Sequence, residues 1–251
     1  MAHKLGKLAP KFHPRTLQLS KYLNTDSLPP VDERVYREYK TPPEAKLMFG
    51  NDVYGDCVWA MSANYIILAT VHTGSIVIPT LEQVLQGYSD VTGFDPTTGA
   101  NDNGTNMTDA LDYLRTTGLA GHKILAWAQV DPTNLLHRKL GAQIFGATLV
   151  GVQLPNSAEE QFNNGQPWEV VPSNAGIAGG HAILRLGYGS LGDDYATWAK
   201  WDQKSSADWS SHYVDEEYIL VSEMWLDQAT GKTPGGLNLD ALWADIKLLG
   251  A

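Results

Sequence analysis

The sequence predicts an α+β fold whose first half is helical and whose second half is mostly sheet. Two observations predict it: apolar residues recur at helical spacing over residues 57–72, whereas short runs rich in β-branched and aromatic residues dominate after residue 121. The chain has 251 residues, 43% of them hydrophobic and 18% charged, which is typical of a soluble globular protein with a sizeable core. A helical lobe facing a β lobe is the simplest arrangement of these elements.

The first 45 residues predict an extended, proline-rich arm. Their prolines are Pro10, Pro14, Pro29, Pro30, Pro42 and Pro43. Because proline interrupts helices, we expect residues 1–45 to lie over the surface of their own domain or of a neighbouring subunit. The arm begins with basic residues but has no apolar signal-peptide core, and no stretch of the chain reaches the ~18 apolar residues of a membrane span. We therefore expect no classical signal peptide and no membrane partner.

Three helices are predicted in a helical lobe formed by residues 46–120. The first runs from Cys57 to about residue 72, the second from Thr80 to about residue 88, and the third over residues 107–117. The second begins with Thr-Leu-Glu-Gln, which predicts a capping box. The loop 95–109 is rich in Asp and Asn, but its Gly and its last acidic residue do not match a calcium-binding EF-hand loop, so we expect turns and caps there rather than a metal.

Strands dominate the predicted β-rich lobe, residues 121–251. Alternating patterns cover residues 122–130, 144–154, 181–188, 195–201 and 218–222. Helices are expected there only over residues 132–140 and 237–249. Together with the helical lobe, this part would form one domain with a cleft between two lobes.

Cys57 is the only cysteine, and it stands where a glycine-punctuated loop runs into the first helix. The sequence there is Gly-Asn-Asp-Val-Tyr-Gly-Asp-Cys-Val-Trp-Ala, residues 50–60. The N-terminal end of a helix favours an anion, so this position should lower the thiol pKa and make Cys57 a candidate nucleophile. We expect the preceding Asp56 to cap the helix. A single cysteine excludes an internal disulfide and a thiolate-rich zinc site.

His181 is the candidate base for such a nucleophile. It lies in Gly-Gly-His-Ala-Ile-Leu, residues 179–184, at the start of a predicted strand. The two glycines allow another backbone to approach closely, and the strand would hold the imidazole on a rigid element. Because a cysteine nucleophile needs a base within hydrogen-bond reach, the two motifs predict a Cys57–His181 pair across the cleft.

These motifs resemble those of the papain-like cysteine peptidase superfamily. Its members place the nucleophile in a Cys-x-x-Cys-Trp-Ala loop at the start of a central helix, the base in a Gly/Asn-x-His-Ala strand, and a Ser-Trp-Gly strand afterwards; here the last is Thr-Trp-Ala, residues 197–199. Nearly the whole chain also looks like an uncharacterised group of papain-fold proteins from actinobacteria and their phages. It shares with them Gly-Tyr-x-Asp-Val-Thr-Gly-Phe at residues 87–94 and Gly-His-Lys-Ile at residues 121–124.

The resemblance implies further site residues and one vacancy. Asn51 stands six residues before the nucleophile, where relatives carry the glutamine of the oxyanion hole. Ala196 stands where the asparagine that orients the histidine belongs, so another group must supply that acceptor, and Asp202 is the first candidate. Three tryptophans could roof the cleft as one does in the family: Trp198, Trp201 and Trp209.

The resemblance implies a papain-like cysteine peptidase or amide hydrolase that acts on a peptide or protein and needs no cofactor or metal. An alternative is a papain-fold structural or binding protein with a vestigial cleft, such as a virion surface or decoration component, which would bind other virion or self subunits through residues 1–45. A third is acyl transfer by the same residues. The formal charge of −10 opposes nucleic-acid binding. With no classical signal peptide or membrane span expected, the location stays open between cytoplasmic and virion-associated.

Overall fold

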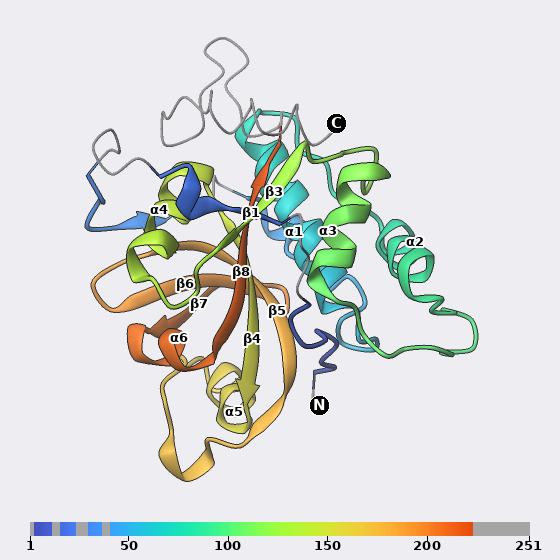
Figure 1. Ribbon diagram of the computed structural model, residues 1–251. Helices are drawn as coiled ribbons and strands as arrows, with labels where there is room; N and C mark the ends of the chain where they lie inside the picture. Colours follow the sequence, from blue (N-terminus) through green and yellow to red (C-terminus); the bar gives the residue numbers. More distant parts are fainter. Residues whose placement is uncertain (1–2, 12–15, 24–29, 37–40, 223–251) are drawn as a thin grey trace.

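The first three α-helices and the sheet lie on two sides of the molecule in the computed structural model, which describes residues 3–11, 16–23, 30–36 and 41–222 (Figure 1). On one side are α1 (Cys57–His72), α2 (Leu81–Thr92) and α3 (Met107–Thr116). On the other side are β3 (Ala126–Val130), α4 (Leu135–Phe145), β4 (Thr148–Pro155), α5 (Asn156–Asn163), β5 (Ile177–Tyr188), β6 (Gly192–Thr197), β7 (Lys200–Ser206), α6 (Ala207–Tyr213) and β8 (Val214–Val221). The predicted α+β fold is confirmed.

The described strands form one mostly antiparallel sheet in the order β1-β3-β8-β4-β5-β6-β7. Two short strands come from the first 45 residues: β1 (Leu17–Gln18) runs parallel to β3, and β2 (Val35–Tyr36) pairs with β5. At the centre of the sheet, Gly151 of β4 lies between Ala182 of β5 and Glu216 of β8. One residue along β4, Val152 is paired with His181. These positions place the site described below.

Helix α1 is the central helix of the fold. Its side chains from residue 57 to residue 70 are all buried, because it packs against β5 on one side and against α2 and α3 on the other. A helix that is apolar all round is expected to be surrounded in this way. Trp59 anchors it to the neighbouring loop through a hydrogen bond from Nε1 to Thr105 Oγ1 of 3.0 Å. No helix in the described part of the chain is long and apolar enough to cross a membrane.

Several predicted elements agree with the structure. The capping box at Thr80 is confirmed, since its side chain accepts from Gln83 N while Gln83 returns a hydrogen bond to Thr80 N. The described parts of the predicted arm pack on the chain itself, and residues 3–8 run between the helices and β5 (Figure 1). The predicted helix over residues 237–249 lies outside the described residues.

The predicted strand over residues 195–201 is wrong, because it is a hairpin. Strand β6 ends at Thr197, β7 begins at Lys200, and Trp198 and Ala199 turn the chain with φ of 46° and 60°. Both values lie in the left-handed region, which hairpin turns usually fill with Gly or Asn, so this sequence carries no ordinary turn signal. Helices α5 and α6 were not predicted, and residues 144 and 145 belong to α4 rather than to a strand.

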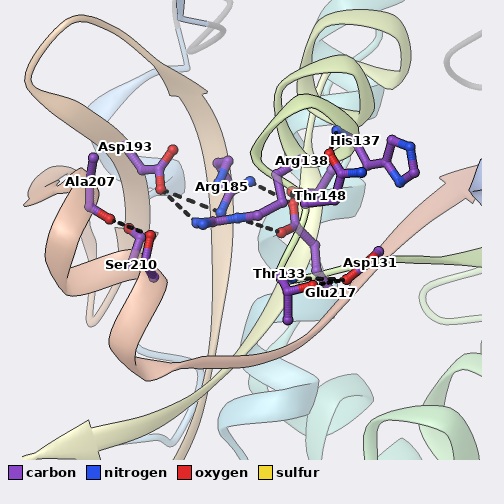
Figure 2. Close-up of polar contacts among 12 residues, drawn as sticks. Asp131, Thr133, His137, Arg138, Thr148, Arg185, Asp193, Ala207, Ser210 and Glu217 are labelled. Carbon is purple, nitrogen blue, oxygen red and sulfur yellow. Dashed lines mark hydrogen bonds and ion pairs between the residues drawn. The ribbon is translucent and has the colours of Figure 1, made fainter.

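A buried cluster of four charges joins α4 to the sheet (Figure 2). Arg185 donates to Glu217 at 2.7 Å, and Arg138 donates to Asp193 at 3.0 Å. Thr148 donates to the same glutamate at 2.5 Å. The two positive and two negative side chains balance each other, as buried charges must. We call Arg138, Arg185, Asp193 and Glu217 the scaffold cluster.

Candidate active site

Cys57 is the first residue of α1 and is 1% exposed. The carbonyl of Asp56 accepts hydrogen bonds from the N–H groups of Trp59 and Ala60, which fixes the first helical turn behind the thiol. The thiol lies close to the backbone of Ala182 on β5. The central helix and the central sheet therefore meet at this sulfur.

Asp56 does not cap the helix, contrary to the sequence prediction. Its carboxyl accepts no cap hydrogen bond, and both oxygens are buried without a hydrogen-bond partner within the described residues. Burial raises the pKa of this carboxyl well above its usual range. Because burial favours the neutral acid, Asp56 opposes a thiolate at Cys57 less than an ionised carboxylate would.

His181 faces the same narrow pocket as Cys57, between β5 and the β6–β7 turn. Its Nε2 lies 2.8 Å from Thr197 Oγ1, and the indole of Trp198 stacks on the ring with centroids 4.6 Å apart. The other ring nitrogen, Nδ1, is buried and has no hydrogen-bond partner within the described part of the chain. If Nε2 carries the proton and donates it to Thr197, Nδ1 is free to accept one.

Thr197, and not Asp202, contacts the histidine. Asp202 is exposed and so does not lie at the buried His181 ring, which corrects the sequence-based choice of orienter. Ala196 points into the core between the sheet and α1, whereas the next residue reaches His181. Strand alternation next to the Trp198 position could have identified Thr197 from the sequence, since its hydroxyl accepts a hydrogen bond as an amide oxygen does.

Asn51 lies in the same pocket and is 3% exposed. Its Nδ2 donates to the main-chain carbonyl of Lys4 at 2.9 Å and more weakly to that of Tyr54 at 3.3 Å. An amide that donates to a peptide carbonyl has the chemistry that an oxyanion donor requires. Of the other tryptophans considered for the cleft, Trp201 and Trp209 are core residues.

Residues 3–8 lie in the cleft that the sequence predicts between the two lobes. Lys7 N–H donates to Gly180 O at 3.0 Å, on the residue before His181. On the opposite wall, Thr105 N–H donates to Gly6 O at 2.7 Å, and Thr105 O accepts from Leu8 N–H at 3.1 Å. The N-terminal segment, residues 3–8, is thus held by main-chain hydrogen bonds to both walls.

Glycines make this close approach possible. A Cβ built on Gly6 would stand 1.8 Å from Gly55 O, and one on Gly180 would stand 2.1 Å from Lys7 O. Both distances are far shorter than any real carbon–oxygen contact, so a side chain at either position would force the segment away. The glycines around Cys57 and before His181 therefore serve contact with a peptide backbone.

Burial keeps the Cys57–His181 pair uncharged. It raises the pKa of the Cys57 thiol to about 11, although the nearby backbone of Ala182 and Gly6 acts in the opposite direction. It lowers the pKa of His181 to about 3, with a smaller contribution from His3. At neutral pH the covered site therefore holds a thiol and a neutral imidazole rather than a reactive ion pair.

No group of three His, Cys, Asp or Glu side chains in the described residues could hold a metal ion. No protein-family model matches the chain, and no curated protein sequence does either. Solved structures do match.

Xylellain, a cysteine protease from Xylella fastidiosa, aligns with 88% of this chain and 98% of its own at 17% identity and a TM-score of 0.68. A procathepsin B from Trypanosoma congolense aligns with 88% and 87% at 11% identity and a TM-score of 0.59. A Carica candamarcensis cysteine protease in complex with E-64 aligns with 76% and 99% at 12% identity and a TM-score of 0.53. The chain therefore has the fold of the papain-like cysteine proteases.

Proposed function

We propose that this protein is a papain-like cysteine peptidase or amide hydrolase that uses Cys57 as nucleophile and His181 as base. The observation that carries the proposal is that the two side chains line one pocket, with His181 Nε2 on Thr197 and its Nδ1 free. A base held at one nitrogen by an acceptor presents the other nitrogen in a fixed orientation. The similarity to solved cysteine proteases supports the proposal at the level of the fold.

The reaction follows from these positions. His181 Nδ1 takes the proton of the Cys57 thiol as the sulfur attacks the substrate carbonyl carbon. The C–N bond then breaks, and the imidazolium returns the proton to the leaving amine, which leaves an acyl thioester on the sulfur. A water molecule, deprotonated by the same imidazole, hydrolyses this thioester and restores the thiol.

Asn51 and the N-terminal end of α1 would stabilise the oxyanion of the tetrahedral intermediate. Asn51 Nδ2 already donates to one peptide carbonyl, that of Lys4, and the Cys57 N–H stands at the start of the helix. Donors aimed at the developing negative charge are often the largest catalytic contribution in acyl transfer. A substrate carbonyl would take the place of the Lys4 carbonyl once the N-terminal segment has left.

The test opens the cleft first. In Gly6→Ala the added Cβ meets Gly55 O, so the N-terminal segment should leave. We expect this variant to cleave a mixture of synthetic peptides, with the products identified by mass spectrometry. We also expect iodoacetamide to alkylate its Cys57 faster than that of the unchanged chain.

Two further substitutions in the Gly6→Ala chain separate the role of Cys57 as nucleophile from that of His181 as base. Cys57→Ser should abolish cleavage, and His181→Gln should both abolish cleavage and slow alkylation, because no base would then take the thiol proton. Cleavage that survives Cys57→Ser, or an alkylation rate that His181→Gln leaves unchanged, would refute the proposal. Adding a primary amine distinguishes acyl transfer from hydrolysis, since a transferase would yield amide conjugates.

The filled cleft favours a second candidate function, a papain-fold binding protein that never opens. Such a protein could be a virion component of the phage-associated group that the sequence resembles. Its signature is the burial of Cys57 at 1% exposure under the protein's own residues. If Cys57→Ser leaves every binding and assembly property intact, and no variant that frees the segment cleaves peptides, this second candidate is favoured.

A further inference from the structure

The side chain of Lys7 is fully buried against Gly151 of β4 and Glu216 of β8. Its Nζ lies 3.0 Å from Asp215 Oδ2, 3.0 Å from Glu216 Oε1 and 3.1 Å from the carbonyl oxygen of Leu8. Lysine is rarely buried completely unless its charge is paired. We call the site formed by Gly151, Gln153, Asp215 and Glu216 the Lys7 pocket.

The pocket owes its depth to a glycine of the central sheet. Gly151 lies between the strand that bears Ala182 and the strand that bears Glu216. A Cβ built on Gly151 would stand 2.2 Å from Lys7 Cε, so any larger residue would occupy the space that the lysine stem takes. The main chain is thus shaped for a long unbranched side chain.

The polar end of the pocket is built to receive a cation. Glu216 is fully buried, and Tyr218 donates to its Oε2 at 2.8 Å, which leaves Oε1 directed at Lys7. Gln153 donates to Asp215 Oδ2 at 2.6 Å and holds the second carboxylate in place. Within the described residues, Lys7 is the only cation paired with either carboxylate. Glu216 Oε1 has no hydrogen-bond donor within the described residues, so the loss of its ion pair with Lys7 would leave a buried charge uncompensated, which is costly.

The Lys7 pocket lies next to the candidate nucleophile, as the path of the N-terminal segment through the cleft shows. Gly6, the residue before Lys7, contacts Gly55 and lies close to the Cys57 thiol. Lys7 N–H itself donates to Gly180 O, next to the candidate base His181. A peptide held by the same main-chain acceptor would place one side chain in the Lys7 pocket and a neighbouring peptide bond near the thiol.

We propose that the Lys7 pocket is the specificity subsite of the cleft, that it selects a lysine side chain in a peptide substrate, and that Lys7 occupies it as a built-in mimic of that substrate. This inference rests on the proposed peptidase function, because only in a peptidase is the peptide in the cleft a substrate. The binding preference itself does not require catalysis, and the two are therefore tested separately.

The test uses the full chain with Lys7→Glu, in which three carboxylates would meet in one pocket and expel the N-terminal segment. Iodoacetamide should then alkylate Cys57 at least about tenfold faster than in the unchanged chain, because a lost charge-assisted contact corresponds to a factor of that size or more. Lys7→Arg retains the cation and serves as the matched control; its alkylation rate should stay nearer to that of the unchanged chain. Equal rates for Lys7→Glu and the unchanged chain would overturn the proposal.

The opened Lys7→Glu chain then receives a fluorescent peptide with the sequence of residues 3–9, His-Lys-Leu-Gly-Lys-Leu-Ala. Its partner peptide carries norleucine in place of the second lysine, which keeps the stem and removes the charge. We expect the lysine peptide to bind at least about tenfold more tightly by fluorescence anisotropy. Adding Glu216→Gln should reduce this preference, whereas Asp208→Asn on the exposed face of α6 should retain it.

Equal affinities of the two peptides, or no binding of either to a chain whose Cys57 is freely alkylated, would overturn the subsite. Peptide cleavage is scored independently. Lysine-selective binding without cleavage would support the subsite and refute the peptidase, while cleavage without a lysine preference would do the reverse.

Discussion

Two buried charge clusters on the sheet use the same chemistry but differ in where their cations come from. In the scaffold cluster, Arg138 and Arg185 belong to α4 and β5, elements that also carry the core. In the Lys7 pocket, the carboxylates belong to β8, but the cation comes from the N-terminal segment. The first cluster can separate only if the fold opens, whereas the second can separate if one short segment leaves.

The difference shows which parts of the site are permanent. The contacts of His181 with Thr197 and Trp198 lie within the sheet and its turn, so they should persist when the cleft opens. The contacts of Asn51 with Lys4 and of Gly180 with Lys7 depend on the segment and can be given to a substrate instead. In the proposed peptidase, fixed catalytic groups and exchangeable peptide contacts would let the N-terminal segment close the site without disrupting it.

The largest expected effect is on stability and concerns the scaffold cluster. Arg185→Met would leave Glu217 and Asp193 with a single buried cation, which should cost about 3–5 kcal/mol of unfolding free energy. Lys7→Met removes one buried cation in the same way, but the N-terminal segment can then leave and water can hydrate the carboxylates. The loss of unfolding free energy in Lys7→Met should therefore be clearly smaller. Urea denaturation of both variants measures the difference, and equal losses would show that the N-terminal segment is as permanent as the sheet.

The second effect is on the pH dependence of the thiol. With its pKa at about 11 rather than the ordinary 9.0, Cys57 in the covered chain should hold about a hundredfold less thiolate near pH 8 than a hydrated thiol. Alkylation rates of Gly6→Ala should therefore rise at lower pH than those of the unchanged chain. Coincident profiles would mean that the segment does not control the thiol.

The same thiol should affect stability in alkali. An unfolded chain loses the thiol proton near pH 9.0, whereas the folded chain keeps it up to about pH 11, so the unfolded state binds fewer protons between these values. The unfolding free energy should then decrease as pH rises through that range. The comparison with Cys57→Ala, which has no such proton, isolates this contribution.

The third effect concerns the permanent side of the site. Thr197→Val keeps the shape but removes the acceptor of His181 Nε2, which should lower kcat for peptide cleavage in an opened chain about 10- to 100-fold, with KM little changed. Thr197→Ser restores the hydroxyl and should recover most of the rate. A uniform loss in both variants would indicate a packing role for Thr197 instead.

How much of this arrangement could be predicted from the sequence depends on the range of the interactions. Helical periodicity placed α1, and the glycine-framed motifs selected Cys57 and His181, because these signals are local in the chain. The left-handed turn at Trp198 and Ala199 has no turn residues of the usual kind, so its hairpin was read as one strand.

The rest of the site depends on contacts between distant segments. Lys7 and Glu216 are more than 200 residues apart and meet only through the fold, so no spacing pattern reports them. The sequence places Ala196, which has no acceptor, at the orienting position; in the structure Ala196 packs in the core while the hydroxyl of the next residue, Thr197, contacts the histidine. The sequence-based candidate, Asp202, is a charged residue, whereas the group that contacts the histidine is a hydroxyl.

The smallest expected effect tests that choice. Asp202 is exposed on β7, away from His181, whose Nε2 already contacts Thr197. Asp202→Asn should therefore leave peptide cleavage by the Gly6→Ala chain unchanged and alter its unfolding free energy by less than about 0.5 kcal/mol. A loss of kcat comparable to that of Thr197→Val would instead mean that the orienting group changes when the N-terminal segment leaves, and that the sheet side of the cleft is less permanent than the scaffold cluster beside it.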